Sequence, residues 1–416
     1  MEKFVINGGR RLSGKIRIDS AKNSVLPIIA ASILTDEQVV IKNCPEIADV
    51  KSMIKILGVL GVKTRLEENN LIIDGSGLNS YAIPESLAKE LRSSIFLMGA
   101  LISRAKKADL FLPGGCDIGK RPIDIHLKAL RELGVSVLEM GSEIICSVKA
   151  LNGRSIFLDY PSVGATENLM LAAIFANGKT EIHNSAKEPE IVDLMRFLNS
   201  MGAKIYGAGT STILVEGVKR LHGTTYSPMP DRIETGTYLI AAAITGGEVE
   251  LSNCNSKNIY PLIHKLCDNT CKFILKNDII YLKSGESRVS FSFSTGPYPF
   301  FPTDMQAQTM ALLVVSDGNG IVSENVFETR FKHVPELIRM GANIDVKGRN
   351  AYIKGIKRLH GAEINATDLR GGAALVLAGL NAEGVTVIDG IRHVERGYCN
   401  IDKKLLSLGA EIKRLN

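Results

Sequence analysis

The chain has 416 residues, of which 45% are hydrophobic and 23% are charged. This composition excludes a disordered or collagen-like chain, and the length favours two or three domains. Fifty Lys and Arg residues against 44 Asp and Glu residues leave a net charge of only +6. Such an excess fits the binding of small anions better than that of nucleic acid, since the chain also lacks Trp for stacking on bases.

The apolar runs at residues 25–34, 239–244 and 311–315 are much shorter than the roughly 18 residues that a membrane-spanning helix needs. The amino terminus has no apolar signal region, and the seven cysteines are scattered along the chain. We therefore expect reduced thiols and a cytoplasmic protein that does not associate with a membrane.

In chain order, six segments open a helix of small apolar residues with a few polar residues. These segments begin at Ala21, Leu91, Ser162, Asp231, Thr303 and Thr367. Ser, Thr and Asp are favoured at such starts because they cap free N–H groups. Successive starts are separated by about 64–75 residues, the length of a βαβ-type unit. The sequence therefore predicts six related α/β units, grouped as three in each of two lobes, with residues 226–231 as a proline-rich crossover between the lobes.

A second recurring pattern is a Leu or Met followed by Gly and a small apolar residue, which predicts the end of a helix and the start of a strand. The glycines of this pattern are Gly58, Gly61, Gly134, Gly202, Gly341 and Gly409. Leu266 and Cys267 occupy the corresponding place without a glycine. A third pattern, G-x-x-R-L-x-G, occurs at residues 8–14, 217–223 and 355–361.

The most unusual segment is the loop LPGGCDIGKRPIDIH at residues 112–126, which is followed by a predicted helix at about 123–133. Cys116 lies in this loop with Lys120 and Arg121 close behind it, and neighbouring cations lower the pKa of a thiol and make it reactive. A P-loop is excluded because Arg121 stands where Ser or Thr must hold Mg²⁺. Cys116, Asp124 and His126 match no familiar zinc spacing, so a metal site is not expected.

The motifs taken together resemble the family of UDP-N-acetylglucosamine 1-carboxyvinyltransferases, which are enolpyruvyl transferases. The resemblance covers essentially the whole chain. It is carried by residues 20–24 (SAKNS), 113–126, 162–166 (SVGAT), 230–235 (PDRIET), 301–306 (FPTDMQ), 328–337, 366–370 (ATDLR) and 395–398 (ERGY).

This resemblance implies a fold as well as a reaction. The fold is a two-lobed inside-out α/β barrel in which each lobe consists of three βαβαββ-type repeats. The first lobe would comprise residues 1–21 plus 230–416, and the second lobe would comprise residues 22–229 and carry the mobile Cys116 loop, with the active site in the cleft between them. The reaction is transfer of the enolpyruvyl group of phosphoenolpyruvate to the 3′-hydroxyl of UDP-N-acetylglucosamine, through a tetrahedral intermediate and with release of phosphate. This is the first committed step of peptidoglycan precursor synthesis, and it requires no cofactor and no protein partner.

The resemblance also implies the residues that act. The catalytic residues would be Cys116, Asp304, Lys22, Arg396 and Asp368. Asp304 would be the general base, and Cys116 would act either as general acid or in product release and would be the target of fosfomycin. Phosphoenolpyruvate would meet Lys22, Arg92, Arg121, Arg330, Arg370 and Arg396, which suits a ligand with a phosphate and a carboxylate. UDP-N-acetylglucosamine would meet Asn23, Arg92, Arg121, Pro122, Ile123, Asp124, His126, Leu127, Ser162, Val163, Gly164, Asp304 and Val326.

Other interpretations of these residues stay open. Asp304 and Asp368 could each be a simple helix cap, and His126 could be structural. Tyr160 stands where some relatives have Lys, and Gly371 and Gly372 replace the usual small Ala or Ser residues. The alternatives for the whole chain are the shikimate-pathway enolpyruvyl transferase, a catalytically weak regulatory paralogue that binds nucleotide sugar, and, least favoured, a nucleic-acid-binding protein.

Overall fold

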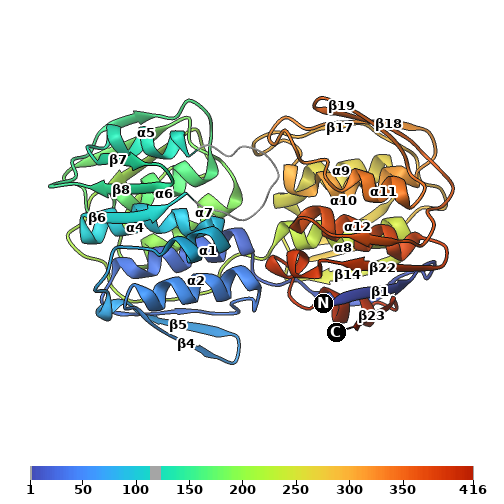
Figure 1. The fold of residues 1–416 in the computed structure, drawn as a ribbon, viewed down its shortest axis with the longest axis horizontal. Helices are drawn as coiled ribbons and strands as arrows, with labels where there is room; N and C mark the ends of the chain where they lie inside the picture. The colour runs from blue at the N-terminus through green and yellow to red at the C-terminus, as the bar shows by residue number, and fades with distance from the viewer. Residues whose placement is uncertain (1, 113–122, 416) are drawn as a thin grey trace. The chain divides into compact units, whose positions relative to one another are not determined.

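The computed structural model describes residues 2–112 and 123–415, so that Cys116, Arg121 and Pro122 lie outside the described residues. The chain divides into two compact units (Figure 1). Unit 1 holds residues 2–19 and 230–415, and unit 2 holds residues 20–112 and 123–229. The first boundary therefore follows Asp19, two residues before the boundary expected after Ala21, and the second follows Met229.

Unit 2 contains three sheets in the part of the chain that is described. Their strand orders are β13 (Thr225–Tyr226), β3 (Gln38–Ile41), β5 (Asn70–Asp74), β4 (Lys63–Glu67); then β6 (Lys107–Phe111), β8 (Glu143–Ser147), β7 (Ser136–Met140); then β11 (Lys204–Tyr206), β12 (Thr212–Glu216), β10 (Lys179–His183), β9 (Ser155–Phe157). Its helices are α1 (Lys22–Ala31), α2 (Ala48–Val59), α3 (Glu85–Glu90), α4 (Phe96–Ala105), α5 (Asp124–Glu132) and α7 (Pro189–Ser200), with α6 (Val163–Ala173) and the 3₁₀ turns η1 (Ser32–Leu34), η2 (Gly75–Gly77) and η3 (Arg92–Ile95).

Unit 1 likewise shows three sheets among its described residues. Their strand orders are β15 (Lys272–Lys276), β16 (Ile279–Lys283), β14 (Glu248–Ser252), β2 (Ser13–Arg17); then β17 (Phe293–Ser294), β18 (Asn319–Ser323), β20 (Asn350–Lys354), β19 (Asn343–Lys347); then β21 (Glu363–Asn365), β22 (Val385–Asp389), β1 (Lys3–Asn7), β23 (Glu411–Leu415). Its helices are α8 (Arg232–Thr245), α9 (Tyr260–Asp268), α10 (Gln306–Val314), α11 (Val334–Arg339), α12 (Leu369–Asn381) and α13 (Ile401–Ser407), with the 3₁₀ turns η4 (Ser256–Ile259), η5 (Thr303–Met305) and η6 (Ile391–Arg396).

All six of these sheets follow one plan, which is a parallel strand pair extended by two antiparallel strands. In the sheet of β9 to β12, for example, Ile182 of β10 lies opposite Ile156 of the parallel β9 and opposite Ile213 of the antiparallel β12. In the sheet of β6, the parallel partner is reduced to a single bridge between Ala82 and Asp109. The prediction of six related α/β units is confirmed.

Pairing between the two ends of each unit closes the series of repeats. In unit 2 the last strand, β13, pairs with β3, so that Thr225 lies opposite Val40. In unit 1, β1 lies between β22 and β23, where Val5 faces Val387 on one side and Lys413 on the other. This pairing explains why the amino-terminal residues belong to the same unit as the carboxyl-terminal ones.

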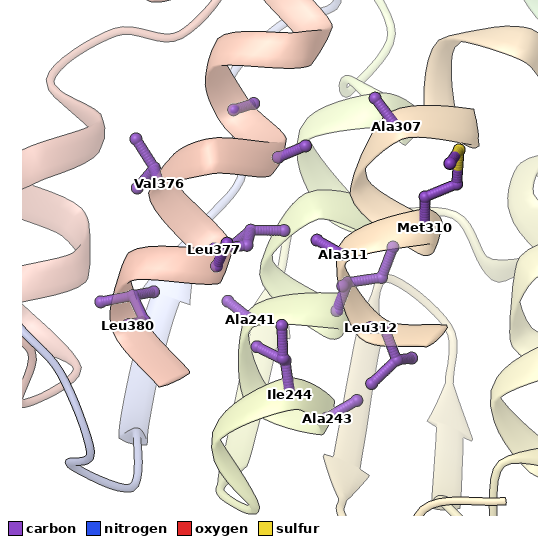
Figure 2. Close-up of a cluster of buried hydrophobic side chains, with 14 of the residues drawn as sticks. Ala241, Ala243, Ile244, Ala307, Met310, Ala311, Leu312, Val376, Leu377 and Leu380 are labelled. Atoms are coloured by element: carbon purple, nitrogen blue, oxygen red, sulfur yellow. The ribbon is translucent and has the colours of Figure 1, made fainter. Parts of the chain in front are cut away.

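Helices rather than strands form the centre of each unit. In unit 1 almost every residue of α8, α10 and α12 is buried, and Figure 2 shows their aliphatic side chains meeting. A helix that is apolar on every side is stable only when neighbours surround it, which agrees with these positions. The strands bury alternate residues, as expected for sheets with one face on the core and one outward. The predicted inside-out α/β fold is confirmed.

Most of the predicted helix ends are correct. Gly61, Gly134, Gly202, Gly341 and Gly409 each follow an outer helix with φ between 90° and 98°, a conformation that glycine adopts without strain. The prediction is wrong for Gly58, which lies inside α2. It is also wrong for Cys267, because α9 continues to Asp268 and the left-handed residue is Thr270, with φ 77°.

Within the described residues, no helix is long and apolar enough to cross a membrane. The six cysteines found there are all free thiols, four of them buried. Burial raises the pKa of the Cys44 and Cys271 thiols to about 12, so that both stay protonated at neutral pH.

Candidate active site

The polar helix starts of the six repeats do not all serve as caps. Asp231 and Asp368 each accept hydrogen bonds from two backbone N–H groups at the start of α8 and α12, and Ser162 caps α6. Asp304 is different, because it is the second residue of η5 and the residue before that turn is Pro302. The interpretation of Asp304 as a helix cap is therefore wrong, and its carboxylate has other partners.

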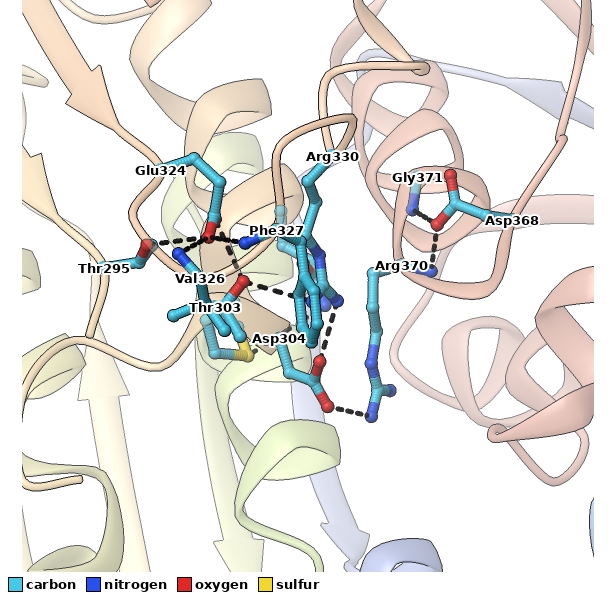
Figure 3. Close-up of polar contacts among 12 residues, drawn as sticks. Thr295, Thr303, Asp304, Glu324, Val326, Phe327, Arg330, Asp368, Arg370 and Gly371 are labelled. Carbon is cyan, nitrogen blue, oxygen red and sulfur yellow. Dashed lines mark hydrogen bonds and ion pairs between the residues drawn. The ribbon is translucent and has the colours of Figure 1, made fainter. Parts of the chain in front are cut away.

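Two arginines of unit 1 bind the two oxygens of the Asp304 carboxylate (Figure 3). Arg330 Nη2 lies 2.7 Å from Oδ1, and Arg370 Nη2 lies 3.0 Å from Oδ2. The side chains of Arg330 and Arg370 are only 3% and 5% exposed, whereas that of Asp304 is 26% exposed. Both arginine side chains are thus almost wholly buried, whereas the Asp304 side chain between them stays partly exposed.

The charge balance of this triad keeps Asp304 ionised. Burial alone would raise the pKa of Asp304, but the Arg370 and Arg330 guanidiniums outweigh it and hold that pKa well below its usual range. Conversely, burial would lower the pKa of Arg370, and Asp304 raises it instead. In this arrangement the Asp304 carboxylate is a weak base, because the two cations stabilise its charged form.

A second carboxylate, Glu324, fixes the loop that follows β18. Glu324 Oε1 accepts hydrogen bonds from the backbone N–H groups of Val326 (2.9 Å) and Phe327 (3.0 Å). Its Oε2 accepts from the Thr303 hydroxyl at 2.9 Å, and Thr303 Oγ1 in turn accepts from Arg330 Nη1 at 3.1 Å. Val326, predicted to hold the nucleotide sugar, is therefore positioned through the same network that positions Arg330 (Figure 3).

Asp368 occupies the start of α12 and orients the next residues of that helix. Its Oδ1 accepts from the N–H groups of Arg370 (3.0 Å) and Gly371 (2.9 Å). A Cβ on Gly371 would lie 2.6 Å from Asp368 Oδ2 and 3.1 Å from the Cβ of His333. Gly371 is therefore required by the close approach of Asp368 and His333, which gives a physical reason for a glycine at this position.

The other side of Arg370 packs against an aromatic ring. The Arg370 guanidinium carbon lies 5.5 Å from the centre of the Tyr398 ring, a cation–π distance. The Tyr398 hydroxyl is 2.8 Å from Thr237 Oγ1 and accepts from Gln308 Nε2 at 3.2 Å. Arg396, two residues before Tyr398, is the last residue of η6. The fold thus brings the motifs at residues 366–370 (ATDLR) and 395–398 (ERGY) together, through the contact between Arg370 and Tyr398.

In unit 2, the helix start that carries Lys22 and Asn23 makes a buried ion pair. Lys22 Nζ lies 2.7 Å from Asp49 Oδ2, and the two side chains are 12% and 4% exposed. Asp49 belongs to the first turn of α2. Asn23 follows Lys22 in the first turn of α1.

The start of α6 presents Ser162, Val163 and Gly164, and His126 packs directly against it. A Cβ on Gly164 would lie 2.8 Å from the Cε1 of His126. His126 Nδ1 lies 2.9 Å from Asn168 Nδ2, while Asn168 Oδ1 accepts the N–H of Gly99 at 2.8 Å. The amide oxygen is thereby occupied, so Asn168 donates to Nδ1 and the neutral ring carries its proton on Nε2. These contacts favour a positioning role for His126.

The remaining predicted residues are placed as follows. Arg92 is the first residue of η3, Asp124 begins α5, Ile123 and Leu127 are buried beside it, and Cys116, Arg121 and Pro122 are outside the described residues. Within residues 2–112 and 123–415, no three His, Cys, Asp or Glu side chains are grouped so that they could hold a metal ion.

Several participants were missed by the sequence analysis. Glu324 and Asp49 lie outside the motifs, next to the ends of a strand and a helix, where nothing in one sequence distinguishes them from solvated carboxylates. His333 lies inside the motif at 328–337 and is 2% exposed, and neither of its ring nitrogens has a hydrogen-bond partner among the described residues. Burial, together with the nearby charge of Arg330, lowers the pKa of His333 to about 4 although Asp368 opposes this, so its imidazole is neutral at neutral pH.

Solved structures with the same fold are enolpyruvyl transferases. The enolpyruvyl transferase NikO from Streptomyces tendae superposes with a TM-score of 0.89 at 24% identity, covering 99% of this chain and 98% of that one. EPSP synthase from Acinetobacter baumannii superposes with a TM-score of 0.78 at 18% identity, covering all of both chains. At these identities the likeness establishes the fold class, a two-domain inside-out α/β protein.

The sequence itself defines the family. The model of the EPSP synthase (3-phosphoshikimate 1-carboxyvinyltransferase) family matches residues 6–405, and the chain belongs to this family of enolpyruvyl transferases. It is 51% identical to UDP-N-acetylglucosamine 1-carboxyvinyltransferase 2 of Caldanaerobacter subterraneus and 48% identical to the protein of that name in Clostridium tetani. Both alignments cover all of each chain. The predicted resemblance and the assignment as a transferase are confirmed.

Proposed function

We propose that this enzyme transfers the enolpyruvyl group of phosphoenolpyruvate to the 3′-hydroxyl of UDP-N-acetylglucosamine and releases phosphate, in the cytoplasm, as the first committed step of peptidoglycan precursor synthesis. The observation that carries the proposal is the Asp304 carboxylate held between Arg330 and Arg370. It joins a potential base to two guanidiniums that can bind the phosphate or carboxylate of phosphoenolpyruvate. The names of the relatives at 48% and 51% identity support the same acceptor.

The triad suggests how substrate binding makes Asp304 a better base. Without substrate the two arginines bind Asp304 and depress its pKa. When the anionic groups of phosphoenolpyruvate take over part of this hydrogen bonding, the stabilisation of the ionised carboxylate falls and its pKa rises. Asp304 then accepts the proton of the sugar hydroxyl as that oxygen attacks the substituted carbon of phosphoenolpyruvate. Base strength is thus coupled to the presence of the second substrate.

The other residues are assigned supporting roles within this proposal. Lys22, with Arg92, Arg121 and Arg396, binds the groups derived from phosphoenolpyruvate, and Asp368 orients Arg370 near the reacting carbons. Cys116 protonates the carbon that becomes the methyl group of the tetrahedral intermediate, and its thiolate takes a proton back from that methyl group as phosphate leaves, which restores the double bond of the enolpyruvyl group.

The nucleotide sugar is assigned to the backbone and side chains at four further positions. The start of α6, at Ser162 to Gly164, offers free N–H groups and the positive end of the helix dipole to the diphosphate. Asn23, Val326 and residues 121–127 complete the set. The side chain at Tyr160 does not supply the cation that Lys supplies in some relatives.

The acceptor is tested by phosphate release from phosphoenolpyruvate with either UDP-N-acetylglucosamine or shikimate 3-phosphate. The proposal predicts release only with UDP-N-acetylglucosamine. Release only with shikimate 3-phosphate would contradict it and support the activity named for the family model. No release with either acceptor, from folded protein that still binds UDP-N-acetylglucosamine, would favour the regulatory paralogue.

The role of Arg396 is separable from that of the nucleotide-sugar residues. Arg396→Ala should raise the KM for phosphoenolpyruvate at least about tenfold, because a charge-assisted hydrogen bond contributes roughly 1.5–3 kcal/mol. The dissociation constant for UDP-N-acetylglucosamine, measured by titration calorimetry, should change less than about twofold. The reverse pattern would remove Arg396 from the phosphoenolpyruvate side.

A further inference from the structure

Unit 1 contains a cavity of about 950 Å³ that the Asp304 triad does not line. Its walls come from residues 8–13, the ends of α8 and α12, the chain after β16 at residues 283–288, and Arg358. Residues 8–13 and Arg358 belong to two copies of the G-x-x-R-L-x-G pattern, for which the proposed reaction has no use. A volume of this size lies within the range of roughly 300–1,000 Å³ that small-molecule pockets occupy.

Basic side chains outnumber acidic ones in the walls. The basic residues are Arg10, Arg11, Lys283, Arg288 and Arg358, and the acidic residues are Glu248, Glu286 and Glu383. Arg10 is paired with Glu411 at 2.9 Å, and Arg358 is paired with Glu383. The Arg11 side chain makes no hydrogen bond or ion pair with any residue that the structure describes. The cavity therefore has a positive charge that its own carboxylates leave uncompensated.

Arg288 is a second source of positive charge in the cavity wall. It is half-buried, and its Nη1 donates to the carbonyl of Ile244, near the end of α8, at 2.6 Å. This bond leaves the N–H groups on Nε and Nη2 for a ligand. Burial lowers the pKa of Arg288, the negative charge of Asp317 raises it, and the positive charge of Arg358 lowers it by a smaller amount. An anion between these guanidiniums would relieve their repulsion.

The rest of the lining favours a polar ligand without an aromatic ring. Glycines at 8, 9, 246, 247, 285 and 384 expose backbone rather than side chains. A Cβ on Gly247 would lie 2.1 Å from the Leu12 carbonyl, so at this position a side chain is sterically excluded. Among the described residues, the apolar lining is confined to Leu12, Leu380 and Ala382, and no aromatic side chain lines the cavity. A nucleobase would find no ring to stack on, whereas hydroxyl groups can bond to the exposed backbone.

We propose that this cavity is a second ligand site, distinct from the catalytic residues, which binds a sugar phosphate with its phosphate on Arg11 and Arg288. The sugar hydroxyls lie against the glycine-rich walls. The site stands independently of the proposed reaction, since none of its residues is assigned a part in catalysis.

The test is titration calorimetry of the full-length protein with glucose 6-phosphate as probe. Saturating UDP-N-acetylglucosamine is present throughout to occupy the proposed nucleotide-sugar residues. Glucose, inorganic phosphate and UMP are titrated in parallel. Glucose 6-phosphate should bind more tightly than all three. Equal or tighter binding of inorganic phosphate or UMP would overturn the assignment to a sugar phosphate, as would the absence of binding.

Variants locate the site. Arg11→Ala and Arg288→Met should each weaken binding by about tenfold or more, because each removes a charge-assisted hydrogen bond. Arg220→Ala is the matched control, since Arg220 has the same place in the copy of the pattern at residues 217–223 but does not line the cavity. Because Arg288 also caps the end of α8, thermal unfolding is used to check that its variant still folds. Arg11 is exposed, so its replacement should not affect folding and gives an independent test of the site. Unchanged affinity in Arg11→Ala would refute the proposal.

Discussion

Replacing Asp304 by Ala tests both the stability and the chemistry assigned to its ion pairs. The change leaves two guanidiniums, 3% and 5% exposed, without the carboxylate that lies 2.7 Å and 3.0 Å from them. Breaking a buried ion pair by removing one partner costs about 3–5 kcal/mol. Since the Asp304 side chain itself is 26% exposed, water compensates part of this cost, and we expect a loss of about 2–4 kcal/mol in the free energy of unfolding. Turnover should fall by about 10² or more, because general base catalysis contributes roughly 10²–10⁴-fold.

The measurement is urea unfolding of both proteins, with and without phosphate, followed by steady-state turnover. Phosphate should stabilise Asp304→Ala more than the parent enzyme, because the freed arginines bind it without competition from a carboxylate. Asp345→Ala is the control: its ion pair with Lys347 has side chains 62% and 72% exposed, so its removal should change stability by no more than about 0.5 kcal/mol. An unchanged unfolding free energy in Asp304→Ala, or equal stabilisation of both proteins by phosphate, would refute the competition between substrate and Asp304.

Three further predictions concern other residues. Cys116→Asp should retain activity, because a carboxylic acid can replace the thiol as proton donor, and should escape fosfomycin; covalent inactivation of that variant, seen by mass spectrometry, would exclude Cys116 as the target. Gly164→Ala should weaken UDP-N-acetylglucosamine binding, because the new Cβ would lie 2.8 Å from His126. Gly58→Ala, by contrast, should stabilise the protein by about 0.5–1 kcal/mol, because Gly58 lies inside α2 with open space around it. The folded-state pKa of His333 is lowered from 6.5 to about 4, so its neutral form supports stability above pH 6.5, and this support is lost as the pH falls towards 4. His333→Gln should flatten that part of the profile of stability against pH. An unaltered profile would contradict the assignment of this pH dependence to His333.

The repeats were predictable because they depend on local chemistry. Five of the predicted glycines end helices with positive φ, since only glycine adopts that conformation cheaply. The role of Asp304 was harder to predict, because an aspartate can serve equally well as a helix cap or in an ion pair. Which role it takes depends on Arg330 and Arg370, which are 26 and 66 residues away in the sequence. Glu324 and Asp49 could not be found at all, since Thr303 and Lys22, which they bind, are brought close to them only by the packing of strands and helices. The arginines of the site were identified from the motif resemblance, whereas the residues that they contact were identified only from the folded structure.

The most direct test of the proposed function is to identify the product by mass spectrometry while phosphate release is measured. UDP-N-acetylglucosamine incubated with phosphoenolpyruvate and the enzyme should become heavier by one enolpyruvyl group, with one phosphate released for each product molecule. Prior treatment with fosfomycin should abolish both signals. Phosphate release without a modified nucleotide sugar, or an unmodified nucleotide sugar under all conditions with folded enzyme, would contradict the proposed reaction.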